Sequence, residues 1–330
     1  MLNPTQKLNP KLYDLNVEQT PIRKGFGEGL VIAAEHDERV VGLCADLTES
    51  TQMHLFKAKF PKRFVEIGVA EQNLAAVASG MAAMGKIPFL TSYAMFSPGR
   101  NWEQVRTTIC YNNQDVKIVG SHAGVSVGPD GGTHQAIEDI AITRVIPRMT
   151  VVVPADAIEA KKATMAIAVR RGPTYLRLAR EKTAVITTED SPFKIGQANV
   201  LIDPVTPEVV IIACGALVYN ALLAAKRLLK DKIEAIVINN HTIKPLDAAT
   251  ILKQVKRAGT VVTVEEHQKA GGLGGAIAEL LAAEFPTPIE FVGVADEFGQ
   301  SGTATELVEH YHLGAEAIVA AAKKVVKRKK

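Results

Sequence analysis

Short runs of β-branched and apolar residues alternate with longer Ala- and Leu-rich segments along most of this 330-residue chain. In its first half, the runs that predict strands are residues 40–46, 87–93, 116–122, 150–156 and 174–179. Near-continuous apolar strands separated by amphipathic helices are typical of a parallel sheet with helices on both faces. The alternation therefore predicts an α/β fold.

The alternation pauses in the polar stretch 183–207, which predicts a connector with one or two short strands. It then resumes with predicted strands at residues 208–214, 233–239, 260–266 and 289–295. A last helix is predicted near residues 318–329. We therefore expect two domains, residues 1–190 and 191–330, each a mostly parallel sheet flanked by helices.

The net charge and the terminal segments limit the classes of partner and the compartment that we expect for this protein. A net charge of +3 from 38 basic and 35 acidic residues does not indicate a phosphate-backbone binder, so we expect no nucleic-acid partner. The basic cluster at residues 323–330 predicts a solvated helix end. The sequence has neither a secretory h-region nor an apolar run near the roughly 18 residues of a spanning helix. This predicts a cytoplasmic protein with no membrane partner.

The sequence gives little support to a cysteine-based metal site or to a nucleotide-binding loop. Cys44, Cys110 and Cys214 lie far apart in apolar surroundings and predict buried thiols in a reducing compartment, with no metal site. The chain lacks GxxxxGK[ST], and its GGLGGA segment at residues 271–276 lacks the spacing of a dinucleotide site. A glycine turn that lets a helix pack closely on a strand explains that segment better.

Glu71 lies in EIGVAEQNLAAVASG, residues 66–80, where a strand-like run passes into a helix. An acid there can be a helix-start residue that interacts with the helix dipole. It can also be a buried carboxylic acid kept for proton chemistry. The neighbouring residues leave both interpretations open.

Three polar candidates lie in the glycine-rich segment GSHAGVSVGPDGGTHQAIED, residues 120–139, directly after a predicted strand. Ligands of open α/β sheets bind beyond the carboxyl ends of the strands, where this segment is expected. Its glycines permit close backbone approach, and His122, Asp130 and His134 offer donors, acceptors and proton relays. A flexible loop with incidental histidines is the alternative.

Other candidates follow two more of the predicted strands. Tyr93 and Phe96, in a chain with only 5% aromatic residues, indicate a stacking surface, with core packing as the alternative. Arg180, which ends YLRLAR, suits a phosphate or carboxylate but is also typical of a surface position.

The order and spacing of these motifs resemble transketolase. The segments EIGVAEQN, TSYAMF, GSHAGVSVGPDGGTHQAIED, VVVPAD and YLRLAR match its C-terminal half, the pyrimidine-binding domain followed by the small C-terminal domain. The resemblance covers nearly the whole chain from about residue 15, and GGLGGAIAE adds weaker support. It implies transfer of a two-carbon ketol unit from a ketose phosphate to an aldose phosphate, with thiamine diphosphate as cofactor.

The resemblance also implies a cofactor site. Glu71 falls on the family's catalytic glutamate, which hydrogen-bonds the aminopyrimidine ring and so helps the thiazolium lose its proton. A carboxylic acid in an apolar pocket can share a proton in this way. Phe96 falls on the aromatic residue that stacks on the pyrimidine, and Tyr93 lines the same pocket. Asp46 and Leu47, in CADL, fall on positions close to the cofactor.

Substrate contacts follow from the same matches. His122, Asp130 and His134 fall on residues that contact donor hydroxyls and assist proton transfer, and Arg180 on an arginine that binds the substrate phosphate. One departure is the segment 97–99, Ser-Pro-Gly, where some members carry a third aromatic residue.

A family motif is absent. Transketolase binds the diphosphate through a metal with a GDG motif, and no GDG occurs in this sequence. The resemblance therefore implies that Mg²⁺ or another divalent metal is held by a separate N-terminal, diphosphate-binding subunit. We expect the chain to be inert alone, to self-associate as a dimer and to act in a two-plus-two heterotetramer.

Three alternatives stay open. A deoxyxylulose-5-phosphate synthase shares the AEQ and DGxTHQ elements but would use pyruvate as donor. The beta subunit of a 2-oxo-acid dehydrogenase shares the two-domain plan but needs no sugar-binding loop. A non-catalytic relative could keep the fold as an interaction module, using the basic tail on RNA in a salt-dependent way.

Overall fold

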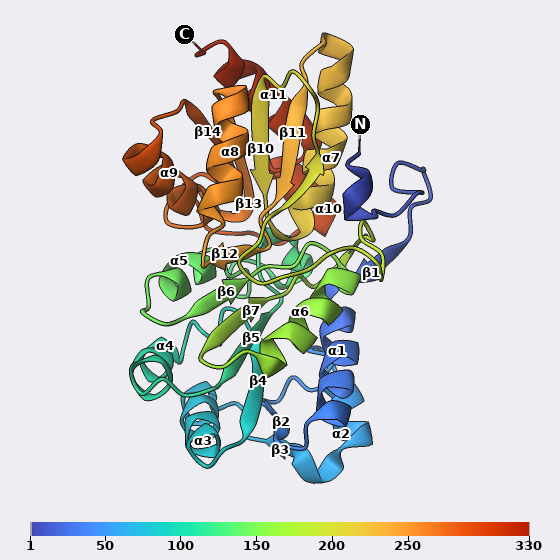
Figure 1. Ribbon diagram of the computed structural model, residues 1–330. Coiled ribbons are helices and arrows are strands. Elements are labelled where there is room, and N and C mark those ends of the chain that lie inside the picture. Colours follow the sequence, from blue (N-terminus) through green and yellow to red (C-terminus); the bar gives the residue numbers. More distant parts are fainter. Residues whose placement is uncertain (1, 330) are drawn as a thin grey trace.

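A seven-stranded sheet forms the first unit of the computed structural model, which describes residues 2–329 (lower half of Figure 1). Six neighbouring strands run parallel, as expected for strands joined by helical crossovers. The last edge strand runs antiparallel to its neighbour. In spatial order the strands are β3 (Phe64–Glu66), β2 (Val40–Cys44), β4 (Ile87–Tyr93), β5 (Lys117–Ser121), β7 (Thr174–Arg177), β6 (Thr150–Val152) and β12 (Thr242–Lys244).

Helices cover both faces of this sheet because successive strand residues point to opposite sides. On one side, α1 (Ile22–His36) and α6 (Ala157–Val169) pack with Phe89 of β4. On the other, α3 (Glu71–Ala83) packs with the next residue of that strand, Leu90. The shorter helices are α2 (His54–Lys59), α4 (Trp102–Gln104), which continues as the π-helical Val105–Tyr111, and α5 (Asp139–Arg144).

A five-stranded sheet forms the second unit (upper half of Figure 1). Four strands are parallel and the edge strand β9 is antiparallel. In spatial order they are β14 (Ile289–Val294), β13 (Val261–Gln268), β10 (Val209–Ala213), β11 (Ala235–Asn239) and β9 (Asn199–Ile202). The helices of this unit are α7 (Val218–Leu228), α8 (Ala248–Ala258), α9 (Leu273–Glu284), α10 (Ala304–His310) and α11 (Ala315–Val326). The predicted α/β class with two flanked sheets is therefore confirmed.

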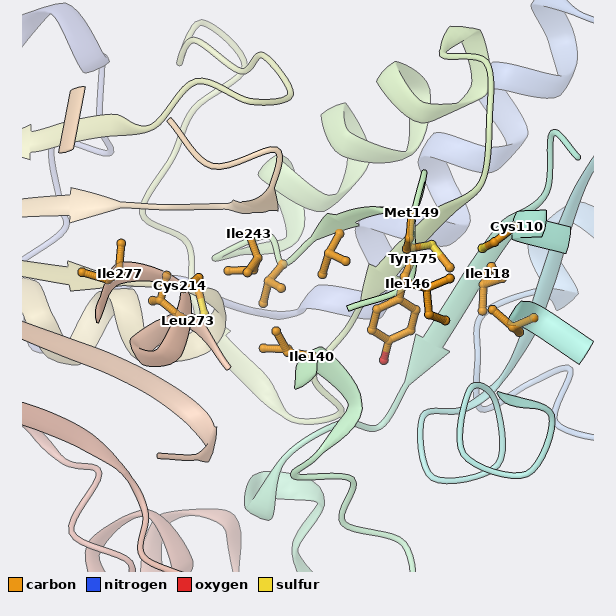
Figure 2. Close-up of a cluster of buried hydrophobic side chains, with 14 of the residues drawn as sticks. Cys110, Ile118, Ile140, Ile146, Met149, Tyr175, Cys214, Ile243, Leu273 and Ile277 are labelled. Atoms are coloured by element: carbon orange, nitrogen blue, oxygen red, sulfur yellow. The ribbon is translucent and has the colours of Figure 1, made fainter. Parts of the chain in front are cut away.

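The two units share one hydrophobic core. A continuous cluster runs from Ile118 and Tyr175 of the first sheet to Cys214, Leu273 and Ile277 of the second unit, as Figure 2 shows. Because one apolar cluster spans both units, each unit stabilises the other.

The chain also crosses between the units. Strand β12 follows β11 in sequence but joins the edge of the first sheet, beside β6. At the other end, the amide of Asn3 donates to the carbonyl oxygen of Leu201 at 2.8 Å, so the N-terminal segment lies along the second sheet. A small ribbon pairs β1 (Gln19–Pro21) with β8 (Lys182–Ala184). The domain boundary at residue 190 therefore stays a proposal, because both the N-terminal segment and β12 pack against the unit on the other side of it.

The predicted strands are present, several of them shorter than expected at their carboxyl ends. The run 40–46 ends as a strand at Cys44, and 150–156 ends at Val152. The strands β1, β3 and β12 and the helices α2, α4, α5 and α10 were not predicted from the sequence. All three cysteines are free and buried, as predicted. Within residues 2–329, the longest apolar helices are too short to cross a membrane.

Candidate active site

The predicted site residues lie along one edge of the seven-stranded sheet. Strands β3, β2, β4, β5 and β7 are consecutive and parallel, so their carboxyl ends share that edge. Each of these strands leads into at least one candidate. The candidates are, in the order of the strands, Glu71, Asp46, Leu47, Tyr93, Phe96, His122 and Arg180.

Glu71 is both a helix-start residue and a buried acid. It is the first residue of α3, and only 4% of it is exposed. The side chain of Asn101 donates to its backbone carbonyl at 3.0 Å, which ties the helix start to the turn after β4. Nε of Arg100 lies 3.8 Å from its Oε2, and the Arg100 side chain is 68% exposed. Among residues 2–329, no hydrogen-bond donor reaches this carboxylate, so its oxygens are available to a ligand.

Four rings gather beside the ends of β4 and β5. Tyr93 and Phe96 are near parallel, with ring centroids 6.0 Å apart. His122 stacks on Tyr93 with a centroid distance of 3.9 Å. His134 approaches Phe96 edge-on, at 5.4 Å. The structure therefore brings the end of β4 together with the glycine-rich segment that begins at the end of β5.

His122 is held as a neutral ring. Burial, followed by the positive charges of Arg23 and Arg180 and by His134, lowers the pKa of His122 from its ordinary value to about 3. Its Nδ1 lies 2.9 Å from the hydroxyl of Ser121. A neutral imidazole can donate through one ring nitrogen and accept through the other, which suits contact with a hydroxyl group.

Two guanidinium groups flank this histidine. Arg180 follows β7, and its Nη1 donates to the carbonyl of Val127 at 2.6 Å. Arg23 lies in the first turn of α1, and its Nε donates to the carbonyl of Arg180 at 3.2 Å. Burial and then the charge of Arg180 lower the pKa of Arg23, and Glu181 partly offsets this. Arg180 is paired with Glu181, with Nη1 and Oε1 3.1 Å apart. Within residues 2–329, Arg23 has no carboxylate partner, which favours an anion beside it.

Arg23 was not predicted from the sequence as a site residue. An arginine in the first turn of a helix is unfavourable, because the helix dipole prefers acids there. That signal could have identified it as a functional candidate.

Glu66 is a second residue that the sequence analysis missed. Its Oε1 accepts from the amide of Asp46 at 2.8 Å and from the amide of Gly68 at 2.9 Å. Its Oε2 accepts from the hydroxyl of Thr48 at 3.0 Å. One carboxylate therefore holds the turn of Asp46 and Leu47 against the segment that leads to Glu71.

Asp130 and His134 lie on the same glycine-rich segment. Asp130 ends the short 3-10 helix Val125–Asp130, four residues before His134. Within residues 2–329, the carboxylates of Asp130 and Asp46 have neither an ion pair nor a side-chain hydrogen bond, and both stay available to a ligand. The described residues also hold no cluster of three or more His, Cys, Asp or Glu side chains suited to a metal ion.

Two family models match the chain. The transketolase pyrimidine-binding domain matches residues 18–185, and the transketolase C-terminal domain matches residues 196–318. The chain belongs to the transketolase family.

Relatives agree with this assignment over nearly the whole chain. A putative transketolase C-terminal section from Methanocaldococcus jannaschii is 43% identical over 300 residues, covering 90% of this chain and 93% of the relative. The 6-deoxy-6-sulfo-D-fructose transketolase subunit SqwH from a Clostridium species is 39% identical and covers 96% of this chain and 98% of the relative. A split-gene transketolase, solved as an inactive β4 tetramer, superimposes with a TM-score of 0.88 at 41% identity, over 94% of this chain and 99% of that one.

The side chains present fit the pyrimidine end of thiamine diphosphate. Tyr93 and Phe96 are only half-buried, which leaves aromatic surface for a flat ring. Glu71 offers a buried carboxylate with no donor from residues 2–329, and so matches a ring nitrogen as partner. These two observations are the reason to place the ring of the cofactor at this edge of the sheet.

Proposed function

We propose that this chain is the C-terminal subunit of a two-subunit transketolase that depends on thiamine diphosphate. It transfers a two-carbon ketol unit from a ketose phosphate to an aldose phosphate and acts in the pentose phosphate pathway of the cytoplasm. The observation that carries the proposal is the buried Glu71 carboxylate beside the half-buried rings of Tyr93 and Phe96.

Bound thiamine diphosphate supplies the carbanion chemistry, and the chain supplies orientation and proton control. Phe96 and Tyr93 present a stacking surface to the pyrimidine ring. Glu71 holds or releases a proton at its carboxylate, away from bulk water. Asp46 and Leu47, fixed by Glu66, line the same side of the pocket.

The remaining residues hold the sugar phosphate. Arg180 and Arg23 provide paired positive charge for the phosphate. His122, neutral at pH values far above its lowered pKa, contacts hydroxyl groups and relays protons. Asp130 and His134 also bind the donor hydroxyls.

A second subunit completes the enzyme in this proposal. It holds the diphosphate through Mg²⁺ or another divalent metal, and two copies of each subunit form a heterotetramer. The related split-gene transketolase was solved as an inactive β4 tetramer, which supports the need for a partner. The proposed pyrimidine-binding and C-terminal domains of this chain are residues 1–190 and 191–330.

The decisive experiment is ketol transfer from xylulose 5-phosphate to ribose 5-phosphate with thiamine diphosphate and magnesium. This chain is assayed alone and with a candidate diphosphate-binding subunit, as wild type and as Glu71→Ala. We expect activity only in the mixture and its loss in the variant. Activity of this chain alone would contradict the split arrangement, and activity with pyruvate as donor would favour a deoxyxylulose-5-phosphate synthase.

A second candidate donor is 6-deoxy-6-sulfofructose, the substrate named for the 39% identical relative. A sulfonate carries negative oxygens as a phosphate does, so the arginine pair suits both groups. The ratio of kcat/KM for the sulfonate and the phosphate donors decides between them.

A further inference from the structure

The second domain touches the segment that carries the donor-binding residues. We call Ala123–Gln135 the donor loop, because it bears Asp130 and His134. It packs against Gly299–Gly302, which lies between β14 and α10. A Cβ added to Gly131 would lie 2.7 Å from Oγ of Ser301, and one added to Gly132 would lie 2.5 Å from the carbonyl of Gly299. Glycine is therefore required for the two segments to meet.

Gln135 joins these segments by hydrogen bonds. Its side chain is buried, with 2% of the residue exposed, although it follows the half-exposed His134. Its Nε2 donates to the carbonyls of Val125 at 3.0 Å and Gly128 at 3.3 Å, both inside the donor loop. It also donates to the carbonyl of Gln300 in the second domain, at 3.0 Å, so its two N–H groups serve three carbonyls and one N–H is shared between two of them. One amide group thus fixes both the fold of the loop and its place on the second domain.

Glu266, at the end of β13, provides a second anchor. Its carboxylate accepts from the backbone amide of Ser126, in the first turn of the loop. Its own backbone carbonyl accepts from Nη2 of Arg177 at 2.8 Å, so the anchor is bound to the first sheet as well. An added Cβ at Gly124, where φ is +90°, would collide with the Glu266 carboxylate. Both ends of the donor loop are therefore held by groups of the second domain: Glu266 binds Ser126 near the start, and the Gln300 carbonyl binds Gln135 at the end.

We propose that Gln135 is a positioning residue for the donor substrate, and that the second domain acts through the Gln300 carbonyl and Glu266 to hold Asp130 and His134 in place. Gln135 touches no substrate itself. The side chains that hold the cofactor, Glu71, Tyr93 and Phe96, come from other strands. Loosening the donor loop should therefore weaken donor binding more than cofactor binding, because His134 approaches Tyr93 and Phe96 only edge-on. This inference rests on the proposed ketol transfer for its kinetic part only.

The test uses two variants that remove the same contact from opposite sides. Gln135→Met keeps the length of the side chain and removes the donor. Gly299→Ala places a methyl group against Oε1 of Gln135, and Gly299 does not have a positive φ, so its own backbone is not strained. Gly275→Ala, in α9 of the same domain, is the matched control, because its Cβ meets only the flexible side chains of Arg144 and Glu279.

The first measurement is amide hydrogen exchange on the full chain without a partner. We expect exchange over residues 124–134 to become about tenfold faster in Gln135→Met and Gly299→Ala, and to stay unchanged in Gly275→Ala. At Glu266, a Gln keeps an acceptor for the Ser126 amide and should preserve protection, whereas Leu should lose it. Unchanged exchange in both contact variants would overturn the proposal.

The second measurement uses the two-subunit mixture. In both contact variants we expect kcat/KM for the donor to fall about 10- to 100-fold, and the Kd for thiamine diphosphate to change about twofold or less. An equal loss of donor and cofactor binding would mean general damage and would also overturn the proposal. If the wild-type mixture transfers no ketol unit, the proposed function fails, and the exchange measurement still decides whether Gln135 positions the loop.

Discussion

The ring of Tyr93 lies almost parallel to the ring of His122, with centroids 3.9 Å apart and an angle of 19° between the planes. The stack covers one face of the His122 ring, and burial together with the positive charges of Arg23 and Arg180 disfavours its protonation. The stacking of Tyr93 and the lowered pKa of His122 therefore depend on the same packing. Substituting Tyr93 or one of the two arginines should therefore change the pKa of the His122 imidazole.

His122 should make the fold sensitive to acid. Its folded pKa of about 3 lies below the ordinary value, so the unfolded chain takes up the proton first as the pH falls from about 6.5 towards 3. The stabilising contribution is complete at neutral pH and is lost in that window. We expect wild type to lose about 3 kcal/mol more than His122→Gln between about pH 7 and pH 4, measured by urea unfolding. Equal pH dependence in the two proteins would contradict the low pKa.

Arg23 should contribute to phosphate binding as strongly as Arg180. Removing a charge-assisted contact costs about 1.5–3 kcal/mol, so Arg23→Ala should raise KM for a phosphorylated donor by about 10- to 100-fold. The effect on kcat should be smaller, and an unphosphorylated ketose should be turned over as in wild type. Arg39→Ala is the control, because Arg39 forms an exposed ion pair with Asp37 on the same domain. A similar loss with the unphosphorylated sugar would exclude a phosphate role.

Glu66 should control cofactor affinity through the turn of Asp46 and Leu47. Glu66→Ala removes the acceptor for the amides of Asp46 and Gly68 and for the Thr48 hydroxyl. We expect about tenfold weaker thiamine diphosphate binding in the complex, and a milder change in Glu66→Gln, which keeps one acceptor oxygen. Calorimetry of cofactor binding measures this, with the exposed Glu49→Ala as control. Wild-type affinity in Glu66→Ala would disprove the link.

The ion pair between Asp139 and Arg177 lies within the first unit and should stabilise the whole fold, because Nη2 of Arg177 also donates to the carbonyl of Glu266 in the second unit at 2.8 Å. Nε of Arg177 lies 2.7 Å from Oδ2 of Asp139, both residues are buried, and the hydroxyl of Tyr175 donates to the same oxygen. Asp139→Ala leaves a buried cation without a partner and should cost about 3–5 kcal/mol of unfolding free energy. The double variant with Arg177→Met should regain part of this loss, because it removes the unpaired charge. If the double variant is less stable than Asp139→Ala, the charge is not the cause.

Local pattern in the sequence predicted the elements of this fold and most of the candidate site. The strand at residues 87–93 is present with the predicted bounds, because an apolar run between a helix and a turn is a local property. Residue type and position after predicted strands singled out Glu71, Tyr93, Phe96, His122, Asp130, His134 and Arg180, and the resemblance to transketolase added Asp46 and Leu47. The strand order brings four of their rings together. The roles of these residues stay predictions until the variants are measured.

Tertiary structure alone decided what depends on distant partners. Strand β12 joins the first sheet only because the chain returns from the second, and the short run 242–244 carries no sign of that register. Arg23 and Arg180 are 157 residues apart, Glu66 binds a turn 20 residues earlier, and Gln135 reaches Gln300 across 165 residues. Propensity and periodicity act over a few residues, whereas these contacts depend on how two whole sheets pack. The sequence by itself determined the elements, the family and the acid at the start of α3, and the packing of the two domains determined what holds the donor loop.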